Sequence, residues 1–429
     1  MSKERTENSK WRETRIAHDV ALNCSLFSVF SSLLLLFYTK HMETLSLIVE
    51  IVAALLTASG IAYSLLALLG ARAFEHDSRA AAKLNVQGFA PGVSILKPVK
   101  GVDPRMYAGF VSHCVQRYAG EYELLFGVSS LDDPAVAEIA RLRIEYPQIG
   151  IRLVECPERL GSNGKVSNLA QMLPHASFEH IVVNDSDILV SPQYLARVIA
   201  PFAPEKTGLV TAPYIGRAEG TLWSRLEALG ISTDFMAGVL TARKLEGGIR
   251  FGLGSTLATT KTALASIGGF EALVEHLADD YELGVRLVRA GYRVELVHEV
   301  VATTVPAYNL RGFCEHQLRW SRSTRDSRRA GYLGLGVTYV LPWALTAVIA
   351  SGGALWSFSL LSLALLVRVA VALTVGVGIL RDGQVLRDLI LLPLRDCFGL
   401  FFWAWSYASD VVVWRGEPFR LRRGRLERV

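Results

Sequence analysis

Apolar runs of membrane-spanning length lie near both ends of this chain, with a more polar middle between them. Val20 to Tyr38 is the first run and Leu45 to Phe74 the second, and each can cross a hydrocarbon core of about 30 Å. Near the C-terminus, Gly336 to Leu380 carries one charge, Arg368, and has the length of a helical hairpin. At 51% hydrophobic residues, the 429-residue chain holds more apolar side chains than a soluble core needs. We therefore expect a soluble domain fused to membrane helices at both ends, and the composition excludes disordered, collagen-like and disulfide-rich classes.

Basic residues predict how the chain is oriented. Five Lys and Arg residues lie in the N-terminal segment 1–19, so the positive-inside rule places that segment in the cytoplasm. Two membrane helices within 20–74 then return the chain to the cytoplasm, where we expect a cytosolic domain over 87–334.

The last apolar candidate, Leu389 to Trp414, is interrupted by three charged residues, Arg395, Asp396 and Asp410. The tail 415–429 is strongly basic and should be cytoplasmic, which a third full crossing would prevent. We therefore expect 335–414 to hold a membrane hairpin followed by an interfacial or re-entrant segment. A true third span, with its charges turned toward other helices, is the alternative.

Charge and cysteine content narrow the classes of function. The net charge is +5, and basic clusters at 319–329 and in the tail flank membrane segments, which favours a lipid surface as their partner. The basic groove with interleaved aromatic residues that is typical of nucleic-acid binders is absent, so we expect no nucleic-acid partner. The five cysteines are scattered and have no CxxC spacing, which argues against a disulfide framework or a zinc site and fits a reducing cytosol.

Short β-rich runs alternate with helical patterns in the middle of the chain. The runs include YELLFGV, HIVVND and GLVTAPYI, and helical patterns at 134–146 and 279–290 lie between such runs. This alternation predicts βαβ units and therefore an α/β, Rossmann-like fold with a mostly parallel sheet. Ligands of such sheets bind at the carboxyl ends of the strands, so residues that directly follow strands are candidates for the site.

Acidic residues occupy two of these positions, and another lies at a predicted helix start. Asp185 and Asp187 follow the apolar run IVVN, and two carboxylates at this spacing can bind one Mg²⁺ or Mn²⁺ together with substrate phosphates; a solvated loop is the alternative. Asp133 follows YELLFGV and precedes a proline, which is also typical of a helix N-cap. Asp280 begins a helical pattern, where it either complements the helix dipole or acts as a general base.

Two further segments carry candidate binding residues. Lys165 follows small residues in GSNGKVSN at a predicted helix start, which suits an anion such as pyrophosphate, although the spacing is not that of a Walker A loop. An ordinary loop with a surface lysine is the alternative. His316, Gln317, Arg319 and Trp320 lie in the helical stretch HQLRW before the C-terminal hairpin, where they either anchor the membrane interface or contact a diphosphate and a sugar or lipid.

Taken in order, these motifs resemble the ceramide glucosyltransferase family, a group of membrane-bound inverting glycosyltransferases with a GT-A-like domain. The resemblance extends from about Gly92 to Arg425 and includes VSILKPVKGVDP, DDPA, GSNGKVSN, NDSDI, LADDY, LRW and WRGEPFRLR. It implies a GT-A-like cytosolic domain held between N- and C-terminal transmembrane helices.

The resemblance implies a role for each matched residue. Asp133 matches an aspartate that contacts the uracil side of a nucleotide, and Lys165 matches a lysine of the nucleotide-side loop. Asp185 matches the D-x-D position that binds metal and diphosphate, and Asp187 completes D-x-D here although many relatives lack this second acid. Asp280 matches the catalytic base.

Two departures from the family pattern concern the donor motif and the acceptor. Arg319 and Trp320 match the end of (Q/R)xxRW, but its first position is His316, with Gln317 one place later; we expect all four to bind the nucleotide sugar. Eukaryotic ceramide enzymes have His-Pro where this chain has Ile231 to Asp234, which leaves the acceptor open.

The resemblance implies transfer of a sugar from a UDP-sugar to a lipid hydroxyl with inversion, with Mg²⁺ or Mn²⁺ as cofactor. The expected donor and acceptor are UDP-glucose and ceramide. Segments such as LWSRLEAL look more like a bacterial, hopanoid-associated subgroup, which favours N-acetylglucosamine transfer to a bacteriohopanepolyol as the alternative. We expect a bacterial-type inner-membrane protein whose catalytic domain faces the cytoplasm.

Two other classes compete with this interpretation. Processive polysaccharide synthases share the aspartates and a QxxRW motif, but they need more C-terminal helices to build a channel. A non-enzymatic membrane scaffold that binds nucleotide is the second rival, and nucleotide binding without any sugar transfer would favour it.

Overall fold

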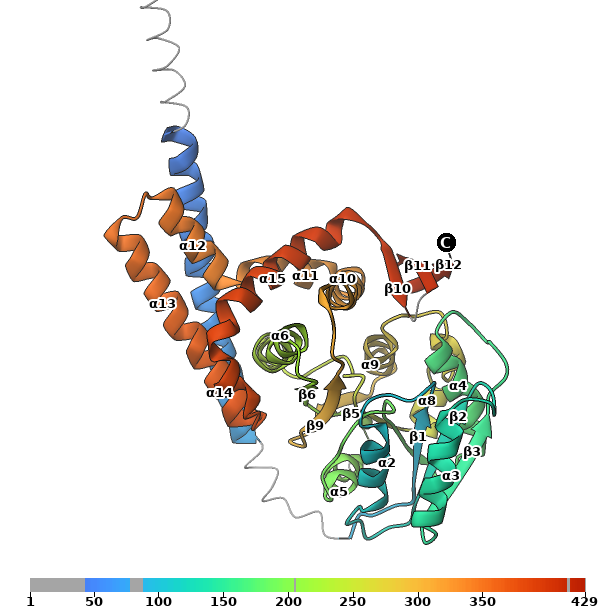
Figure 1. Cartoon of the computed structure of the whole chain (residues 1–429). Helices are drawn as coiled ribbons and strands as arrows, with labels where there is room; N and C mark the ends of the chain where they lie inside the picture. The colour runs from blue at the N-terminus through green and yellow to red at the C-terminus, as the bar shows by residue number, and fades with distance from the viewer. Residues whose placement is uncertain (1–42, 78–87, 204–205, 415–416, 429) are drawn as a thin grey trace, which may run out of the picture. The chain divides into compact units, whose positions relative to one another are not determined.

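The computed structural model describes residues 43–77, 88–203, 206–414 and 417–428 (Figure 1). The predicted basic N-terminus and the first predicted membrane run, Val20 to Tyr38, lie outside the described residues. The chain divides into two compact units, one of residues 1–57 and 343–362 and the other of residues 58–342 and 363–429. In the smaller unit, Ser46 Oγ donates a hydrogen bond to the carbonyl oxygen of Ala350 at 2.9 Å.

The larger unit is built on a seven-stranded sheet with the order β3-β2-β1-β4-β7-β5-β8. Its strands are β1 (Val93–Pro98), β2 (Tyr122–Val128), β3 (Gly150–Glu155), β4 (His180–Val183), β5 (Thr207–Thr211), β7 (Leu257–Thr260) and β8 (Arg293–Leu296). Neighbours pair in parallel except β7, which runs antiparallel to β4 and β5. The central strands are buried on both faces, which explains why they are continuous apolar runs. The predicted mostly parallel α/β sheet is confirmed.

Helices connect these strands and extend the domain beyond the sheet. Between β1 and β8 they are α2 (Met106–Cys114), α3 (Ala135–Glu145), α4 (Gly164–Met172), α5 (Tyr194–Ile199), α6 (Leu222–Gly230), α7 (Met236–Glu246), α8 (Lys261–Ala265) and α9 (Asp279–Arg289). A π-helical segment, Ile231–Phe235, joins α6 to α7 without a break. A separate parallel pair, β6 (Tyr214–Ala218) and β9 (Val301–Val305), lies outside the main sheet. After β9 comes the long helix α10 (Leu310–Ser327), which carries HQLRW.

Within the described residues, two helices are long and apolar enough to cross a membrane, Glu43–Asp77 and Leu355–Ile379, with mean hydropathies of 2.1 and 2.4. The second consists of α13 (Leu355–Val371) and a π-helical continuation, Ala372–Ile379. A third candidate exists if α11 (Arg329–Thr338) and α12 (Val340–Ala350), bent by 52°, count as one span. These helices coincide with the predicted second N-terminal run and the C-terminal hairpin.

The last apolar candidate, Leu389 to Trp414, is not a single helix. After the short helix α14 (Gln384–Asp388), α15 (Leu392–Trp405) has only 14 residues, and the chain then forms β10 (Val411–Trp414). That strand pairs with β11 (Glu417–Arg422), which pairs with β12 (Arg425–Arg428). The end of the predicted segment therefore belongs to an antiparallel sheet with the basic tail, because Val412, Phe419 and Leu426 bury their side chains together. The placement of α15 at a membrane interface remains a prediction.

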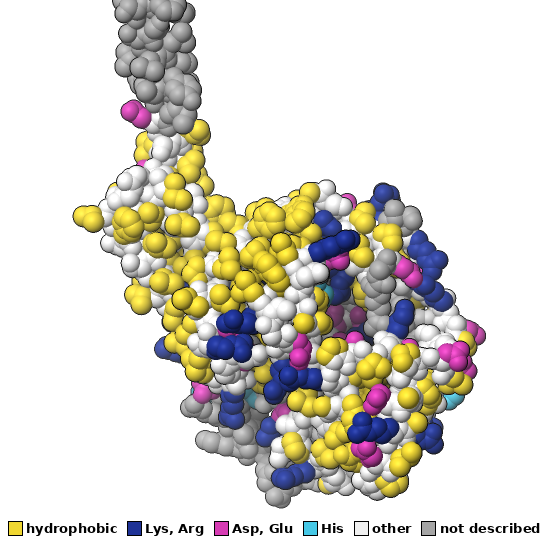
Figure 2. Space-filling model, viewed as in Figure 1, with side chains coloured by type: hydrophobic (Ala, Val, Ile, Leu, Met, Phe, Trp, Pro, Cys, Tyr) yellow, Lys and Arg dark blue, Asp and Glu magenta, His cyan; other side chains and the backbone are white. Residues whose placement is uncertain are grey.

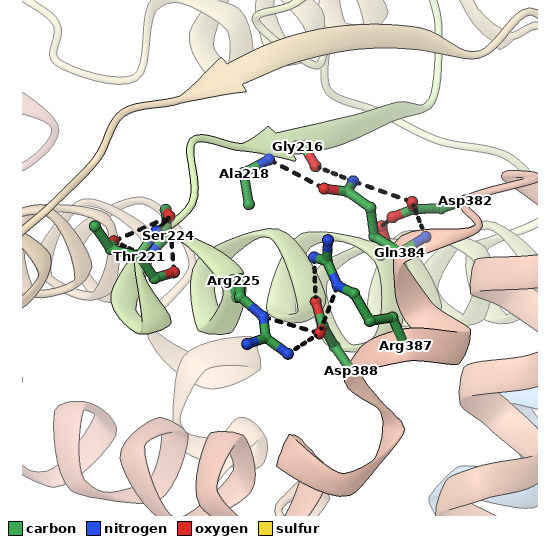
Figure 3. A network of polar contacts seen from close by, with 10 residues as sticks. Gly216, Ala218, Thr221, Ser224, Arg225, Asp382, Gln384, Arg387 and Asp388 are labelled. Atoms are coloured by element: carbon green, nitrogen blue, oxygen red, sulfur yellow. Dashed lines mark hydrogen bonds and ion pairs between the residues drawn. The ribbon is translucent and has the colours of Figure 1, made fainter.

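A polar network joins α6 and β6 to the chain that follows the C-terminal hairpin (Figure 3). Asp388 accepts hydrogen bonds from both Arg225, at 2.9 Å from its Nε, and Arg387, at 3.0 and 2.8 Å. Gln384 donates to the carbonyl oxygen of Gly216 at 2.9 Å and accepts from the backbone N–H of Ala218 at 3.1 Å. This network fixes α14 against α6 and β6. Hydrophobic side chains gather on the surface over α13 and α15, as Figure 2 shows, and Leu366, Phe401 and Trp405 are among the exposed ones.

Candidate active site

A cavity of about 1550 Å³ opens beside the carboxyl ends of β1 and β4. Figure 2 shows the surface hollowed where basic and acidic side chains gather. Eight of the nine residues predicted from the sequence line this cavity: Lys165, Asp185, Asp187, Asp280, His316, Gln317, Arg319 and Trp320. The cavity also reaches Tyr63, Ser64 and Ala67 of the apolar helix Glu43–Asp77. One cavity is therefore lined both by the sheet edge and by a helix of membrane-spanning length.

Asp133 is the ninth predicted residue, and it does not line the cavity. Its Oδ1 accepts a hydrogen bond from the N–H of Ala135 at 2.9 Å at the start of α3, and both of its carboxylate oxygens accept from the N–H of Gly101 at 3.0 Å. These contacts are those of the helix-capping alternative. They also hold the loop after β1, whose Lys100 and Asp103 do line the cavity. A nucleotide contact by Asp133 remains a prediction.

Asp185 and Asp187 lie directly after β4, but their carboxylates are held differently. Asp185 is half exposed, and its Oδ1 lies 2.8 Å from Lys165 Nζ. Asp187 is mostly buried, and its Oδ2 accepts hydrogen bonds from Thr303 Oγ1 and the N–H of Thr304, both at 2.7 Å. Burial raises the pKa of Asp187 despite these hydrogen bonds. Strand β9 therefore fixes Asp187, whereas Asp185 faces the cavity.

The acidic pair fits a hard divalent cation only with help from a substrate. Among the described residues, no group of three or more His, Cys, Asp or Glu side chains is arranged to hold a metal ion. Two carboxylates and the oxygens of a bound diphosphate are the ligands with which Mg²⁺ and Mn²⁺ are commonly bound. The donor set therefore matches a metal that binds together with a nucleotide.

Lys165 joins the acidic residues that follow β4 to those of α9. It lies in the first turn of α4, whose N-cap Asn163 accepts a hydrogen bond from the N–H of Val166 at 3.2 Å. Its Nζ lies 2.8 Å from Asp185 and 3.6 Å from Asp279. Burial alone would lower the pKa of Lys165, but the two carboxylates raise it. The lysine is thus a permanent cation that brings these carboxylates together.

Asp280 has the environment of a general base. It lies in the first turn of α9, and its Oδ1 accepts a hydrogen bond from the N–H of Tyr281 at 2.8 Å. Burial raises the pKa of Asp280 to about 6, with a further contribution from Asp279 and an opposing one from Lys165. A Cβ placed on Gly254 would lie 3.2 Å from Asp280 Oδ2, so the glycine keeps space open beside the carboxylate. A base with a pKa near neutrality is suited to accept a proton from a hydroxyl group.

The HQLRW segment faces the cavity from α10, and Glu227 of α6 positions it. His316 Nδ1 lies 2.9 Å from Glu227 Oε2, and Gln317 Nε2 donates to the same oxygen at 3.2 Å. The ring of Trp320 packs between those of His316, at 5.2 Å, and Phe235, at 6.2 Å between centroids. The motif is therefore attached to α6 and to the π-helical segment that follows it.

The sequence interpretation missed two buried residues that hold the site together. Glu227 is buried, and the only signal for it is a charged residue within the apolar pattern LWSRLEALG. Lys97 at the end of β1 is also buried, and its Nζ donates to the backbone carbonyl oxygen of Asp185 at 3.0 Å. Burial lowers the pKa of Lys97 to about 7, although Asp187 and Asp185 oppose this shift. Its signal is a lysine that continues the apolar strand VSIL.

Comparison with known families accounts for this arrangement. The sequence model of glycosyl transferase family 21 matches residues 52–427. The chain belongs to this family. The match includes every predicted site residue and most of the chain, so the predicted resemblance is confirmed at the level of the family.

Curated relatives support the same placement within family 21. Ceramide glucosyltransferase 3 of Caenorhabditis elegans is 29% identical over 240 residues, which cover 56% of this chain and 51% of that protein. The N-acetylglucosaminyltransferase of Rhizobium meliloti is 25% identical over 299 residues, 65% of each chain. The chain spans about half the length of the ceramide glucosyltransferases of Caenorhabditis elegans that it matches.

A solved structure confirms the fold of this family 21 chain. The mannosyltransferase PcManGT from Pyrobaculum calidifontis, solved in complex with GDP-Man and Mn²⁺, has a TM-score of 0.51 and 19% sequence identity. The match covers 82% of this chain and 99% of that one. The predicted GT-A-like fold is therefore confirmed.

Proposed function

We propose that this chain is a membrane glycosyltransferase that moves a sugar from a UDP-sugar to the hydroxyl group of a lipid, with inversion at the anomeric carbon. The observation that supports this proposal most strongly is the cavity, which contains both the acidic cluster with Asp280 and part of an apolar helix of membrane-spanning length. A water-insoluble acceptor can thus approach a base that lies among nucleotide-binding groups. The family supports transfer of a hexose.

The proposed reaction is a single displacement. The acceptor hydroxyl oxygen attacks the anomeric carbon, its proton passes to the Asp280 carboxylate, and the bond from the anomeric carbon to the diphosphate oxygen breaks, releasing UDP. Attack from the face opposite the leaving group inverts the configuration, and no covalent enzyme intermediate forms. The chain's main contribution is to orient donor and acceptor and to hold Asp280 ready to accept the proton.

The donor would bind at the sheet edge. Asp185 and Asp187 would hold Mg²⁺ or Mn²⁺, which supplies charge stabilisation for the departing diphosphate. The Mn²⁺ in the PcManGT complex supports a metal in this role. Arg319 would face the same diphosphate, and Lys165 would exchange its contact with Asp185 for the donor phosphates.

The names of the relatives support two donor sugars, and those of the ceramide enzymes also support an acceptor. The ceramide glucosyltransferases favour UDP-glucose and ceramide. The N-acetylglucosaminyltransferase of Rhizobium meliloti favours an N-acetylglucosamine donor, which in this chain would serve a hopanoid. In either case we propose an inner-membrane location with the catalytic domain in the cytoplasm, as the basic N-terminus predicts.

A transfer assay tests the proposal. Purified protein in liposomes with Mn²⁺ would receive UDP-glucose or UDP-N-acetylglucosamine and either ceramide or a polyhydroxylated hopanoid, with products identified by mass and anomeric configuration by NMR. A β-linked glycolipid from an α-linked donor is the expected result. An α-linked product would contradict inversion, and nucleotide binding without product from any pair would contradict the lipid transferase itself.

A further inference from the structure

A second group of buried charges lines the same cavity, and the proposed reaction does not use it. Asp234 lies in the π-helical segment after α6, Arg368 lies in the helix Leu355–Ile379, and Arg395 and Asp396 lie in α15. Arg368 Nε donates to the two carboxylate oxygens of Asp396 at 3.0 and 3.1 Å, and Arg368 also pairs with Asp234. We call these four residues the Arg395 cluster.

Arg395 differs from Arg368 because some of its N–H donors have no acceptor within the described residues. Its Nε lies 3.1 Å from Asp234 Oδ2, but within the described part of the chain neither its Nε nor its Nη1 makes a hydrogen bond. Asp234 Oδ2 is likewise without a hydrogen bond there. The residue is only 8% exposed, so water does not freely compensate. Leaving buried donors of a charged group without partners is costly. These atoms have almost no exposed surface, but Arg395 and Asp234 line the cavity through their other atoms, so a rotation of the guanidinium would turn the unused donors toward a ligand there.

The cluster adjoins the reacting end of the cavity through one aromatic ring. Phe235, the neighbour of Asp234, packs on Trp320 of the HQLRW segment and on Tyr214, at 5.5 Å between centroids. Burial raises the pKa of Tyr214, and the negative charge of Asp280 adds to that shift. Tyr214 is therefore within electrostatic reach of the base. π-Helical turns of this kind frequently occur at functional sites.

The charges of the cluster indicate the chemistry of its ligand. Two arginines face two aspartates, so a bound anion would leave a net negative charge in a desolvated space. A neutral group that accepts from Arg395 and donates to Asp234 satisfies both residues without changing the charge balance. A hydroxyl group can do both, and an amide carbonyl can accept from the guanidinium.

We propose that Arg395, supported by Asp234, binds a second neutral polar group of the acceptor lipid, a hydroxyl or amide beyond the hydroxyl that receives the sugar. This inference rests on the proposed function, because it deepens the role of the same cavity. It assigns acceptor selectivity to the Arg395 cluster: lipids with two or more polar groups near the head are favoured over simple long-chain alcohols.

Equilibrium binding to the full chain in detergent tests this without requiring transfer. The probes are N-oleoylsphingosine, which carries two hydroxyls and an amide, oleyl alcohol, which carries one hydroxyl, and phosphatidic acid, which is anionic. For Arg395→Met we expect binding of N-oleoylsphingosine to weaken at least tenfold, while binding of oleyl alcohol and UDP stays within twofold of wild type. Equal loss for both neutral lipids, no loss for either, or tightest binding of phosphatidic acid by the wild type would overturn the inference.

A second variant guards against misfolding of Arg395→Met, and a third serves as a control. A Cβ on Gly230 would lie 2.1 Å from Arg395 Nε, so Gly230→Ala displaces the guanidinium while keeping every charge. Gly230→Ala should reproduce the selective loss of N-oleoylsphingosine binding. If it still discriminates between N-oleoylsphingosine and oleyl alcohol as wild type does, the inference is contradicted. Arg225→Met removes a charge from α6 outside the cavity and should retain the discrimination between the two lipids.

The same variants separate the inference from the proposed function. If wild type and Arg225→Met discriminate between the neutral lipids, Arg395→Met does not, and no sugar is transferred, the lipid site stands and the transferase proposal fails. If sugar is transferred and Arg395→Met glycosylates N-oleoylsphingosine and oleyl alcohol with wild-type KM values, the lipid site fails and the transferase proposal stands.

Discussion

The charges around the two ends of the cavity are balanced in different ways. At the sheet edge, the carboxylates of Asp185, Asp187, Asp279 and Asp280 outnumber the ammonium groups of Lys97 and Lys165. In the Arg395 cluster, two arginines match two aspartates. An excess of negative charge in a buried site calls for a further cation, whereas a balanced cluster with unused donors calls for a neutral partner. This difference is the physical basis for a proposed donor end at the sheet edge and a proposed acceptor end at the Arg395 cluster.

Replacing the base at the donor end should give the largest effect. Asp280→Asn keeps the size of the side chain but removes its ability to accept a proton, so we expect turnover to fall by about 10³-fold. UDP binding, measured by calorimetry, should remain within a few fold of wild type. An Asp280→Asn enzyme with ordinary turnover would show that another group is the base. The proposed division of the cavity into donor and acceptor ends would then be abandoned.

Removing the expected cation should have the next largest effect. Charge stabilisation by a metal contributes several kcal/mol, so chelation with EDTA should lower the transfer rate by about 100-fold. Added Mn²⁺ should restore the rate in wild type but only weakly in Asp185→Asn, which keeps the contacts of Asp187 with β9. Equal restoration in both proteins would show that Asp185 is not a metal ligand.

The pH dependence of kcat/KM tests the role of Asp280 at the proposed donor end. The pKa of Asp280 is raised to about 6, so the base is protonated and inactive at lower pH. We expect kcat/KM to fall about tenfold for each pH unit below this value. The stability of the fold depends on pH in the opposite direction to the rate. Protonated Asp280 stabilises the folded state fully below about pH 3.9, and this contribution is lost as the pH rises through about 6. A rate profile that is flat from pH 5 to 8 would contradict the assignment.

Much of the donor end could be predicted from the sequence because its residues follow strands. Parallel strands bring their carboxyl ends to one edge of the sheet. Asp185 after β4 therefore lies near residues that follow the neighbouring strands, whatever path the connecting loops take. Asp133 also follows a strand, yet its carboxylate is occupied by backbone N–H groups, and the sequence left that alternative open. The antiparallel strand β7 was not predicted, because its short apolar run carries no sign of direction.

The acceptor end could not be predicted because its contacts join distant parts of the chain. Arg368 and Asp234 are 134 positions apart; Asp234 ends the segment that departs from the family's His-Pro, but nothing in the sequence indicates Arg368 as its partner. In the sequence, Arg395 and Asp396 only interrupt an apolar segment, and their partners depend on how α15 packs on the π-helical segment. The tail strands were missed for a different reason: β10 and β11 are neighbours in the sequence, but the residues of β10 are apolar enough to be assigned to the preceding apolar segment.

The smallest effect on function should come from Arg225→Met, in the network of Figure 3. Asp388 is buried but keeps Arg387 as a partner when Arg225 is lost, so we expect unfolding free energy to fall by only about 1–2 kcal/mol. A lower thermal midpoint with unchanged KM for the acceptor is the expected result. Because this charge pair has its hydrogen bonds satisfied by protein and does not line the cavity, it should matter for stability alone. Altered acceptor selectivity in Arg225→Met would mean that polar contacts with the C-terminal hairpin act on the cavity as a whole. The distinction between Arg225, whose hydrogen bonds are satisfied, and Arg395 would then be lost.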